Sequence, residues 1–247
     1  MSSIESSTTT MSAVKHAVSL SVFFPCYNEE ANVEPLARKT VGVLESLVAD
    51  WEIILVDDGS KDRTGEIIDR LAAEDERIRA VHHKHNGGYG AALRSGFRKA
   101  RKDLVFFTDG DGQFDIRELD LLLSRRDDAD LVCGCRRKRQ DKLIRKINAA
   151  CWGFLVQRVL GFRCRDVDAA FKLLPRRLVQ AMPLRSTGAL ISAELLARAT
   201  RQGCTILDLP VTHLPRTAGQ ATGARLSVIL RAFGELFKLR KDIVAGR

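Results

Sequence analysis

The chain has 247 residues, 45% of them hydrophobic and 29% charged, which is enough for one large domain with its own core. No apolar run reaches the about 18 residues that a membrane-spanning helix needs, so we expect that the chain does not span a bilayer by itself. The net charge of +9 favours polyanionic partners, namely nucleic acid, an anionic membrane surface or phosphorylated ligands.

The positive charge is concentrated in two segments. Seven of the eleven residues from Arg136 to Lys146 are basic, and residues 225–247 hold six basic and two acidic side chains. A solvated basic face is an alternative interpretation of both segments. Nucleic acid is disfavoured, because aromatic residues make up only 6% of the chain and none interleaves with the first basic run.

The cysteines and the N-terminus indicate a cytoplasmic protein. The six cysteines form no Cys-x-x-Cys pair, and a chain of this size does not need disulfides. Residues 1–10 are rich in Ser and Thr and lack the pattern of a signal peptide. We therefore expect the reducing cytoplasm and a disordered tail over residues 1–17.

Alternating strands and helices are predicted for the first half of the chain. In chain order, the patterns predict a strand at 18–24, a helix at 32–48, a strand at 52–56, a helix at 62–73, a strand at 78–82, a helix at 89–100, a strand at 103–108, a helix at 116–124 and a strand at 130–134. This alternation predicts an α/β fold with a mostly parallel sheet covered by helices on both faces.

The second half has a different pattern. We expect helices at 144–160 and 191–202, a strand at 205–209 and a loop rich in Pro, Thr and Gly up to 223, with no element assigned over 166–174. One domain over 18–223 is the simplest interpretation, followed by a basic amphipathic helix over 224–247. That helix could rest on an anionic bilayer or pack on the domain.

Polar clusters follow three of the predicted strands. They are Pro25–Glu30, Asp57–Ser60 and Asp109–Gln113. In open α/β sheets, ligands bind outside the carboxyl ends of the strands. We therefore expect the three clusters to converge on one crevice.

Asp109, Asp111 and Gln113 offer three oxygen donors within five residues. Mg²⁺ and Mn²⁺ prefer such donors and keep coordination places for substrate phosphates. Gly110 and Gly112 allow the tight turn that would aim alternate side chains at one point. An ordinary Asp/Gly turn is the alternative, whereas an EF-hand is excluded because no Glu follows at the required place.

Other clusters have weaker signals. Asp57 and Asp58 could hold a ribose or a base edge, or serve a turn in which Ser60 or Asp62 caps the next helix. The Gly87–Gly90 segment could cradle phosphate or be a flexible turn. The histidines at 82, 83 and 85 suggest a zinc site only weakly, because such runs in loops rarely form a complete site.

With these residues in order, the chain resembles a family 2 glycosyltransferase of the GT-A (Rossmann-like) fold, of the dolichol-phosphate or polyprenol-phosphate sugar transferase group. The resemblance covers residues 18–223. The segments that carry it are Phe24–Glu30, Val56–Ser60 with Asp62 and Thr64, Asn86–Ala92, Asp109–Gln113, Gly134–Arg136, Asp166–Lys172, Glu194, and Pro210–His213 with Arg216 and Gly219.

The resemblance implies a nucleotide-sugar and metal half at 18–136 and an acceptor half at 137–223. Residues implied for the nucleotide side are Pro25, Tyr27, Glu29, Val56, Asp58, Gly110 and Arg216. Metal ligands would be Asp109, Asp111 and Gln113, and the catalytic set Asp109, Asp111, Arg136 and Asp168. Substrate contacts are implied for Arg136, Arg145, Asp166 and Glu194.

The implied reaction is inverting transfer from a GDP- or UDP-linked sugar, with Mg²⁺ or Mn²⁺, to a polyprenyl phosphate at the inner face of the cytoplasmic membrane. A lipid phosphate needs no general base, since its oxyanion is already the nucleophile. A sugar or protein hydroxyl acceptor would need one, and Asp166 or Asp168 is the candidate.

The chain departs from the lipid-phosphate enzymes in three ways. The place of Asp168 is often hydroxyl- or glycine-rich in the dolichol enzymes. Ala221-Thr222 stands where they commonly carry Ser-Lys, and the chain lacks the C-terminal membrane helices of many members. A non-catalytic nucleotide- or polyanion-binding module is an alternative. A nucleotidyltransferase is disfavoured, because the segment after the first strand, Cys26–Glu30, is not a Gly-rich loop bearing Arg or Lys.

Overall fold

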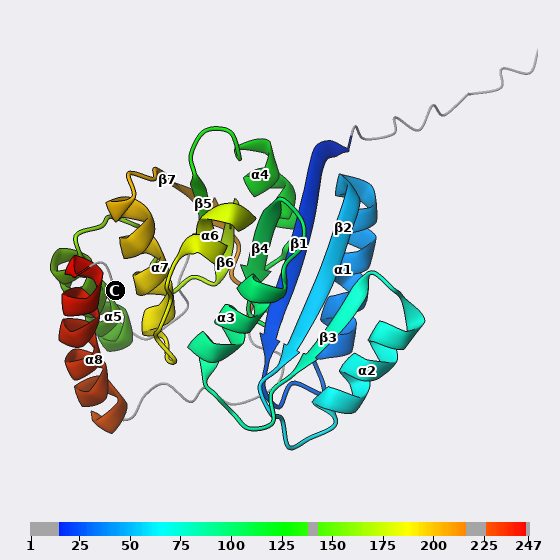
Figure 1. Cartoon of the computed structure of the whole chain (residues 1–247), viewed down its shortest axis with the longest axis horizontal. Coiled ribbons are helices and arrows are strands. Elements are labelled where there is room, and N and C mark those ends of the chain that lie inside the picture. Colours follow the sequence, from blue (N-terminus) through cyan, green and yellow to red (C-terminus); the bar gives the residue numbers. More distant parts are fainter. Residues whose placement is uncertain (1–14, 138–142, 216–225, 246–247) are drawn as a thin grey trace, which may run out of the picture.

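The structure is a computed structural model that describes residues 15–137, 143–215 and 226–245, with the backbone alone over 143–150 and 226–233. Its described part contains one seven-stranded sheet in the order β3-β2-β1-β4-β6-β5-β7 (Figure 1). The strands are β1 (His16–Cys26), β2 (Val48–Asp57), β3 (Ile78–His82), β4 (Leu104–Thr108), β5 (Leu131–Arg136), β6 (Phe171–Pro175) and β7 (Ile206–Val211).

Helices lie on both faces of this sheet. Phe23 and Phe24 of β1 are both fully buried, and because neighbouring side chains of a strand point to opposite faces, both faces must be covered. Figure 1 shows α3 in front of the sheet and α1 behind it. The helices are α1 (Val33–Leu47), α2 (Thr64–Glu74), α3 (Tyr89–Lys99), η1 (Ile116–Glu118), α4 (Leu119–Ser124), α5 (Leu143–Leu160), α6 (Arg176–Ala181), α7 (Leu190–Arg201) and α8 (Leu226–Val244).

The predicted α/β fold with a mostly parallel sheet is confirmed. β1 pairs in parallel with β2 and β4, and β2 with β3. The segment predicted as one helix over 116–124 is a 3₁₀ turn followed by α4. β1 begins at His16, inside the predicted tail, and residues 1–14 lie outside the described part.

β6 is an antiparallel strand that the sequence did not predict. It lies between β4 and β5 and pairs antiparallel with both. Its five residues include Lys172, which interrupts the apolar run although its side chain is fully buried. The ammonium group donates hydrogen bonds to the carbonyl oxygens of Val167 and Ala169, so this lysine is satisfied inside the core.

The second half of the chain continues the same sheet and adds a group of helices. β5 pairs with β7, while α5, α7 and α8 pack on one another at the left of Figure 1. α8 buries Leu236, Leu239 and Ile243, so one face of the predicted amphipathic helix packs on the domain. Among the described residues, no helix is both long and apolar enough to cross a membrane.

Candidate active site

The loops after β1, β2 and β4 line one cavity, as the sequence predicted. The amide of Asp58, just after β2, donates to the carbonyl oxygen of Cys26 at the end of β1 at 2.9 Å, which holds these strand ends together. The cavity measures about 580 Å³ and is called the carboxylate cavity below. Its lining residues are Pro25, Cys26, Tyr27, Glu29, Asp58, Asn86, Gly88, Tyr89, Ala92, Asp109, Gly110, Asp111, Asp168, Ala189 and Ser192.

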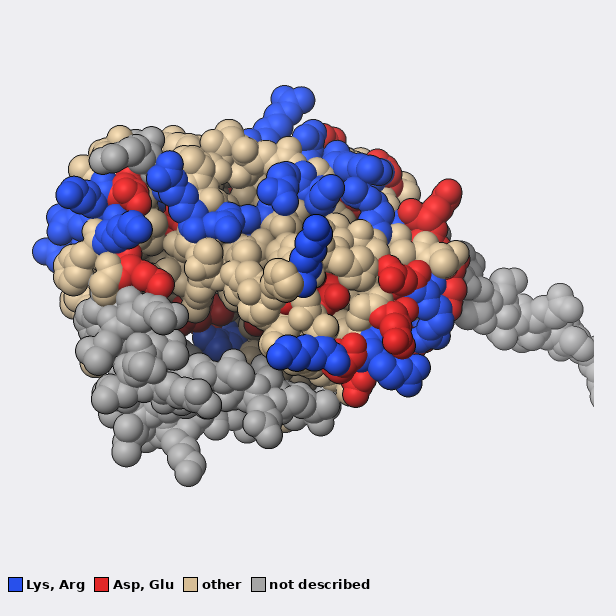
Figure 2. All heavy atoms as spheres, turned by 60° about the horizontal axis from the view of Figure 1, so that its bottom comes forward, with Lys and Arg blue, Asp and Glu red and all other residues tan. Residues whose placement is uncertain are grey.

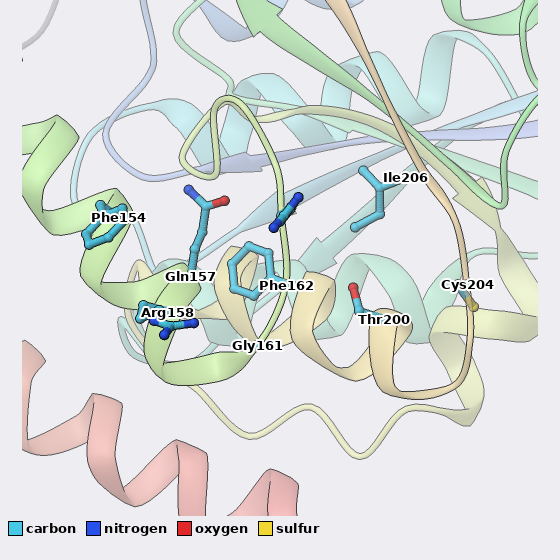
Figure 3. Close-up of a pocket in the computed structure, with 9 residues that line it drawn as sticks. Phe154, Gln157, Arg158, Gly161, Phe162, Thr200, Cys204 and Ile206 are labelled. Carbon is cyan, nitrogen blue, oxygen red and sulfur yellow. The ribbon is translucent and has the colours of Figure 1, made fainter.

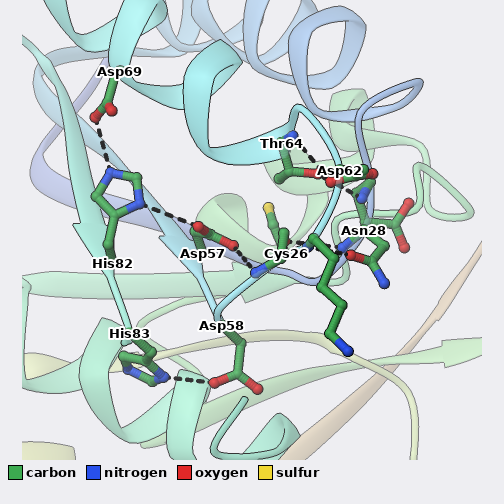
Figure 4. Close-up of polar contacts among 12 residues, drawn as sticks. Cys26, Asn28, Asp57, Asp58, Asp62, Thr64, Asp69, His82 and His83 are labelled. Atoms are coloured by element: carbon green, nitrogen blue, oxygen red, sulfur yellow. Dashed lines mark hydrogen bonds and ion pairs between the residues drawn. The ribbon is translucent and has the colours of Figure 1, made fainter. Parts of the chain in front are cut away.

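Reciprocal hydrogen bonds join the first two of these loops (Figure 4). The Asn28 side chain accepts from the Lys61 amide at 2.8 Å, and the Asn28 amide donates to the Ser60 hydroxyl at 3.0 Å. Asn28 has a φ of 55°, in the left-handed region that Asn tolerates better than most residues. The Glu29 amide donates to the Thr64 hydroxyl at 2.8 Å. This network fixes the backbone that carries Tyr27 and Glu29 to the cavity.

Asp57, the last residue of β2, and Asp58, which follows it, have different partners. Asp57 accepts from the Ser60 amide at 2.9 Å and lies 3.2 Å from Nδ1 of His82, which in turn contacts Asp69 (Figure 4). Burial lowers the pKa of His82, but hydrogen bonds to Asp57 and Asp69 outweigh it and raise this pKa. Asp57 therefore supports the turn, and it is Asp58 that lines the carboxylate cavity.

Asp58 organises the glycine turn that precedes α3. Its carboxylate accepts from the amides of Gly87 and Gly88, each at 2.9 Å, and lies 2.6 Å from Nδ1 of His83. Gly88 has a φ of 88°, a conformation that glycine adopts without strain. The turn is therefore fixed by hydrogen bonds in this structure, rather than left as the free loop that its composition allowed.

The segment just before α7, which includes Ser186 and Thr187, packs against the start of α3 next to this glycine turn. The amide of Gly90 donates to the Thr187 carbonyl oxygen at 2.7 Å, and a Cβ on Gly90 would lie 2.3 Å from the Ser186 carbonyl oxygen. That segment is held by the fully buried Glu194, whose carboxylate accepts from the amides of Arg185 and Ser186.

Tyr89, the first residue of α3, reaches the predicted metal motif. Its hydroxyl donates a hydrogen bond to Asp109, and burial, together with the charges of Asp109, Asp111 and Asp168, raises the pKa of Tyr89 well above its ordinary value. Tyr89 lines the cavity, yet it was not among the residues proposed for the site. Its place directly after Gly87-Gly88, at the start of a predicted helix, was the signal that could have found it.

Only the first part of the Asp109–Gln113 turn lies in the cavity, and its last residue contacts Leu214 instead. Asp109, Gly110 and Asp111 line the cavity, and a Cβ on Gly110 would lie 2.8 Å from the Pro25 carbonyl oxygen. Gln113 does not line it. Its side-chain nitrogen donates to the Leu214 carbonyl oxygen at 3.3 Å, and its own carbonyl oxygen accepts from the Leu214 amide.

Five carboxylates give the cavity a strongly negative lining: Glu29, Asp58, Asp109, Asp111 and Asp168. No Lys, Arg or His is among its described lining residues. Within the described ranges, no three acidic, His or Cys side chains form a complete metal site. Asp109 and Asp111 nevertheless fit a Mg²⁺-like ion, because such ions are usually held by one or two carboxylates, with water and substrate phosphates completing the shell.

Arg136 and Asp166 lie together in a separate cavity of about 360 Å³. The guanidinium donates from Nε and Nη2 to the two carboxylate oxygens at 2.6 and 2.7 Å, a bidentate pair of the strong kind. Arg137 and Arg165 also line this cavity, which is called the arginine cavity below. The sequence proposed Arg136 and Asp166 as substrate contacts without predicting that they pair.

Besides Gln113, four predicted site residues are not seen to reach the carboxylate cavity or the arginine cavity. Val56 is fully buried in β2 and Glu194 in α7, and neither lines the carboxylate cavity or the arginine cavity. The sheet covers Val56, and the Glu194 carboxylate accepts hydrogen bonds from loop amides. The Arg145 side chain and the whole of Arg216 lie outside the described residues.

A larger cavity of about 860 Å³ contains none of the predicted site residues (Figure 3). It lies between the end of α5, near Phe154 and Arg158, and Ile206, the first residue of β7. Ligands of open α/β sheets bind at the carboxyl ends of parallel strands, whereas this cavity is at the amino end of β7. Its size therefore does not make it the active site.

Comparison with known proteins finds similar sequences over most of this chain. Residues 21–182 match the family described as Glycosyl transferase family 2. The chain is 35% identical over 214 residues to Glycosyltransferase AglD of Haloferax volcanii, covering 83% of this chain and 34% of that protein. It is 32% identical over 207 residues to an undecaprenyl-phosphate 4-deoxy-4-formamido-L-arabinose transferase of Salmonella paratyphi A, covering 82% of this chain and 62% of that protein. This chain therefore spans about a third of the length of the Haloferax protein and about three fifths of the length of the Salmonella protein.

Solved structures show the same fold. Glucosyl-3-phosphoglycerate synthase from Mycobacterium tuberculosis in complex with uridine diphosphate superposes with a TM-score of 0.68 at 20% identity, covering 91% of this chain and 81% of that one. The same enzyme in complex with Mn²⁺, uridine diphosphate and glucosyl-3-phosphoglycerate superposes with a TM-score of 0.62 at 20% identity, covering 93% of this chain and 80% of that one. The family match extends over more than half of the chain, and the chain therefore belongs to glycosyl transferase family 2.

Proposed function

We propose that this chain is an inverting glycosyltransferase that moves a sugar from a UDP- or GDP-linked donor to a polyprenyl phosphate at a membrane surface. The observation that carries the proposal is the carboxylate cavity, where the ends of β1, β2 and β4 bring Glu29, Asp58, Asp109 and Asp111 together. Family membership and the undecaprenyl-phosphate transferase among its relatives support it.

The nucleotide is assigned to the part of the cavity near β1 and β2. Pro25 and Tyr27 offer apolar surface there, and Tyr27 is 41% exposed. Glu29 and Asp58 can accept hydrogen bonds from a ribose or a base, because a carboxylate has about four acceptor sites, so existing bonds still leave capacity. Val56 supports this wall from inside the sheet.

A divalent cation, Mg²⁺ or Mn²⁺, is proposed at Asp109 and Asp111, with Gln113 as a further ligand. The charge of the lining supports it, since a nucleotide diphosphate entering five carboxylates would be repelled without a cation. When bound, the ion neutralises the charge that develops on the leaving diphosphate. Mn²⁺ and uridine diphosphate occur together in the related synthase.

The acceptor phosphate is assigned to the arginine cavity. Arg136, Arg137 and Arg165 bring three guanidinium groups there against the single carboxylate of Asp166. Arg145 is proposed to add to this charge, whereas Arg216 is proposed to close over the donor diphosphate. An oxygen of the acceptor phosphate attacks the anomeric carbon as the bond from that carbon to the diphosphate oxygen breaks, which inverts the configuration. No proton needs to be removed, so positioning is the main task of the protein.

The surface of α5 and α8 is proposed to face the membrane. Phe154 is 71% exposed on α5, and Phe237 and Val244 are 55% and 61% exposed on α8. Lys238, Arg240 and Lys241 are exposed on the same helix. Exposed apolar side chains among cations are typical of helices that bind an anionic bilayer surface. Figure 2 shows basic side chains over much of one face of the molecule, mixed with acidic ones.

A hydroxyl acceptor is the second candidate, and the position of Asp168 favours it. Asp168 lines the carboxylate cavity, where the donor is proposed to bind, whereas Asp166 lines the arginine cavity, so Asp168 is the better candidate for a base. Detectable transfer by an Asp166→Ala, Asp168→Ala double variant that still binds the donor would exclude the base role.

The proposal is tested by incubating the protein with a panel of UDP- and GDP-sugars, Mn²⁺ and polyprenyl phosphate, and then assaying the organic phase for glycolipid. We expect one donor to give product, and Asp111→Asn to remove it while Asp120→Asn, an exposed acid on α4, does not. Transfer to water-soluble acceptors alone would contradict the lipid acceptor.

A further inference from the structure

A second, smaller cavity adjoins the carboxylate cavity. It measures about 320 Å³, at the lower end of the range for small-molecule sites. It shares Gly88, Asp168 and Ala189 with the carboxylate cavity, so the two cavities adjoin along these three residues. We call it the Trp152 cavity. It lies between α5, α7 and the segment before α7, and α8 contributes one side chain.

The walls of the Trp152 cavity combine apolar surface with two acids. Trp152 and Val156 come from α5, and Leu190 from α7. Asp168 and Glu235, the latter from α8, supply the carboxylates. No Lys or Arg is among the lining residues that the structure describes. The cavity thus differs in charge from the arginine cavity, where three cations meet.

This lining selects against a phosphate and in favour of a neutral ligand with many hydroxyl groups. Two carboxylates repel an anion, but each accepts hydrogen bonds from O–H donors. Aromatic and aliphatic side chains pack against C–H surface. A pyranose ring has both properties, whereas an isoprenoid chain would leave carboxylates in contact with hydrocarbon, which is costly.

We propose that the Trp152 cavity holds the sugar ring of the donor, with Asp168 and Glu235 accepting hydrogen bonds from its hydroxyl groups. This inference rests on the proposed function, in which the diphosphate lies at Asp109 and Asp111. The sugar must then lie next to the diphosphate, and the Trp152 cavity adjoins the carboxylate cavity there, with Asp168 lining both. Glu235 thereby makes α8 part of the donor specificity.

Two glycines keep the Trp152 cavity open. A Cβ on Gly153 would meet no atom within 4 Å, and a Cβ on Gly188 would meet only Oε2 of Glu235, at 4.0 Å. A larger side chain at Gly153 can therefore fill the cavity without an immediate backbone clash. Gly42 on α1 is a matched control, because it is also helical with nothing within 4 Å of an added Cβ.

The experiment measures dissociation constants by calorimetry with Mn²⁺ for UDP, GDP, UDP-glucose and GDP-mannose. The proteins are the wild type, Gly153→Leu, Glu235→Gln and Gly42→Leu. For the nucleotide sugar that the wild type binds, we expect Gly153→Leu and Glu235→Gln each to weaken binding about tenfold, as loss of a charged hydrogen bond or of space does. The matching nucleoside diphosphate should bind all four proteins alike, which also shows that the variants are folded.

Three results would overturn the inference, and they are distinguishable. If both variants weaken the nucleotide sugar no more than Gly42→Leu does, the sugar lies elsewhere while the proposed function stands. If Gly153→Leu instead weakens binding of polyprenyl phosphate in detergent micelles, the cavity belongs to the acceptor. If the wild type binds none of the four nucleotides, the proposed function itself is contradicted, and the sugar site with it.

Discussion

At the scale of single residues, the site depends on side chains that support others as well as on those proposed to contact ligands. Tyr89 is the clearest case, because its hydroxyl donates to Asp109, a proposed metal ligand. Partners of this kind orient a ligand and tune its basicity, and their loss typically weakens metal binding 10- to 100-fold.

We therefore expect Tyr89→Phe to weaken Mn²⁺ binding about tenfold in the presence of UDP, with little loss of stability, since the ring is retained. Electron paramagnetic resonance of free Mn²⁺ measures this directly. Asp120→Asn, a change at an exposed acid of α4, is the control for Mn²⁺ affinity. Equal Mn²⁺ affinities for wild type and Tyr89→Phe would show that the hydroxyl does not position Asp109.

A second prediction at this scale concerns His82. Its pKa is raised in the folded protein, through the hydrogen bonds to Asp57 and Asp69 that outweigh burial. A raised folded pKa means that protonation stabilises the fold. That stability is fully present below the unfolded pKa of about 6.5 and is lost as the pH rises through the higher folded value.

The wild type should therefore exceed His82→Gln in free energy of unfolding by most at about pH 6 and by least at about pH 9. Urea unfolding of both proteins at several pH values measures the difference. A difference that stays constant with pH would contradict the assigned ion pairs.

At the scale of elements, the first turn of α3 fits closely against the segment before α7. The carbonyl oxygen of Ser186 would lie 2.3 Å from a Cβ on Gly90, so even alanine requires the backbone to move. Glu194 and Arg198 are both buried, and Nη2 of Arg198 lies 2.8 Å from Oε1 of Glu194. The Glu194 carboxylate also accepts from the amide of Ser186, which holds that segment in place. Through this contact the second half of the chain holds the start of α3 in place. It thereby holds Tyr89, whose hydroxyl donates to Asp109.

Gly90→Ala should lower the free energy of unfolding by about 2 kcal/mol, the usual effect of overpacking, and should also weaken Mn²⁺ binding. Gly42→Ala in α1 should have the opposite sign, because an added Cβ there meets nothing, and alanine is the better helix former by up to about 1 kcal/mol. Denaturant unfolding of the two variants side by side measures both effects. Two effects of the same sign would contradict the packing described here.

Strands with an unbroken apolar run could be predicted from the sequence, whereas a short strand with a charged residue inside it could not. The buried runs around Phe23 and Phe106 predicted β1 and β4, and the polar clusters after them predicted the cavity. β6 was not predicted, because Lys172 in a five-residue strand resembles surface sequence. Glu194 was implied as a substrate contact by the family resemblance alone, and nothing in the sequence shows that its carboxylate accepts hydrogen bonds from the amides of Arg185 and Ser186.

At the scale of the whole molecule, opposite charges occupy separate places. The described lining of the carboxylate cavity carries five acids and no cation, while the arginine cavity carries three arginines and one acid. This separation suits a reaction in which one phosphate-bearing substrate enters with a metal ion and the other is held by guanidinium groups. The net charge of +9 alone did not reveal it.

The surface of α5 and α8 gives a prediction for the intact protein. We expect it to bind anionic phospholipid vesicles at low salt and to be released as salt screens the attraction. A Phe154→Ser, Phe237→Ser double variant should lose most of this binding, because both side chains are mainly exposed, while UDP binding is kept.

Vesicle sedimentation measures the fraction of protein bound. The matched control is Leu214→Ser, because Leu214 is an exposed apolar residue that lies next to Gln113 and not on these helices. Equal binding by the double variant and the wild type would exclude this surface.

The central claim is that the carboxylate cavity binds a nucleotide diphosphate through a divalent cation. Calorimetric titration of the wild type with UDP and with GDP, in Mn²⁺ and again in excess chelator, tests it most directly. We predict that one of the two nucleotides binds in Mn²⁺, that its binding is lost in chelator because five carboxylates then repel the diphosphate, and that Asp111→Asn abolishes the Mn²⁺ dependence. Binding of equal affinity with and without the cation, or no binding of either nucleotide in Mn²⁺, would contradict the account.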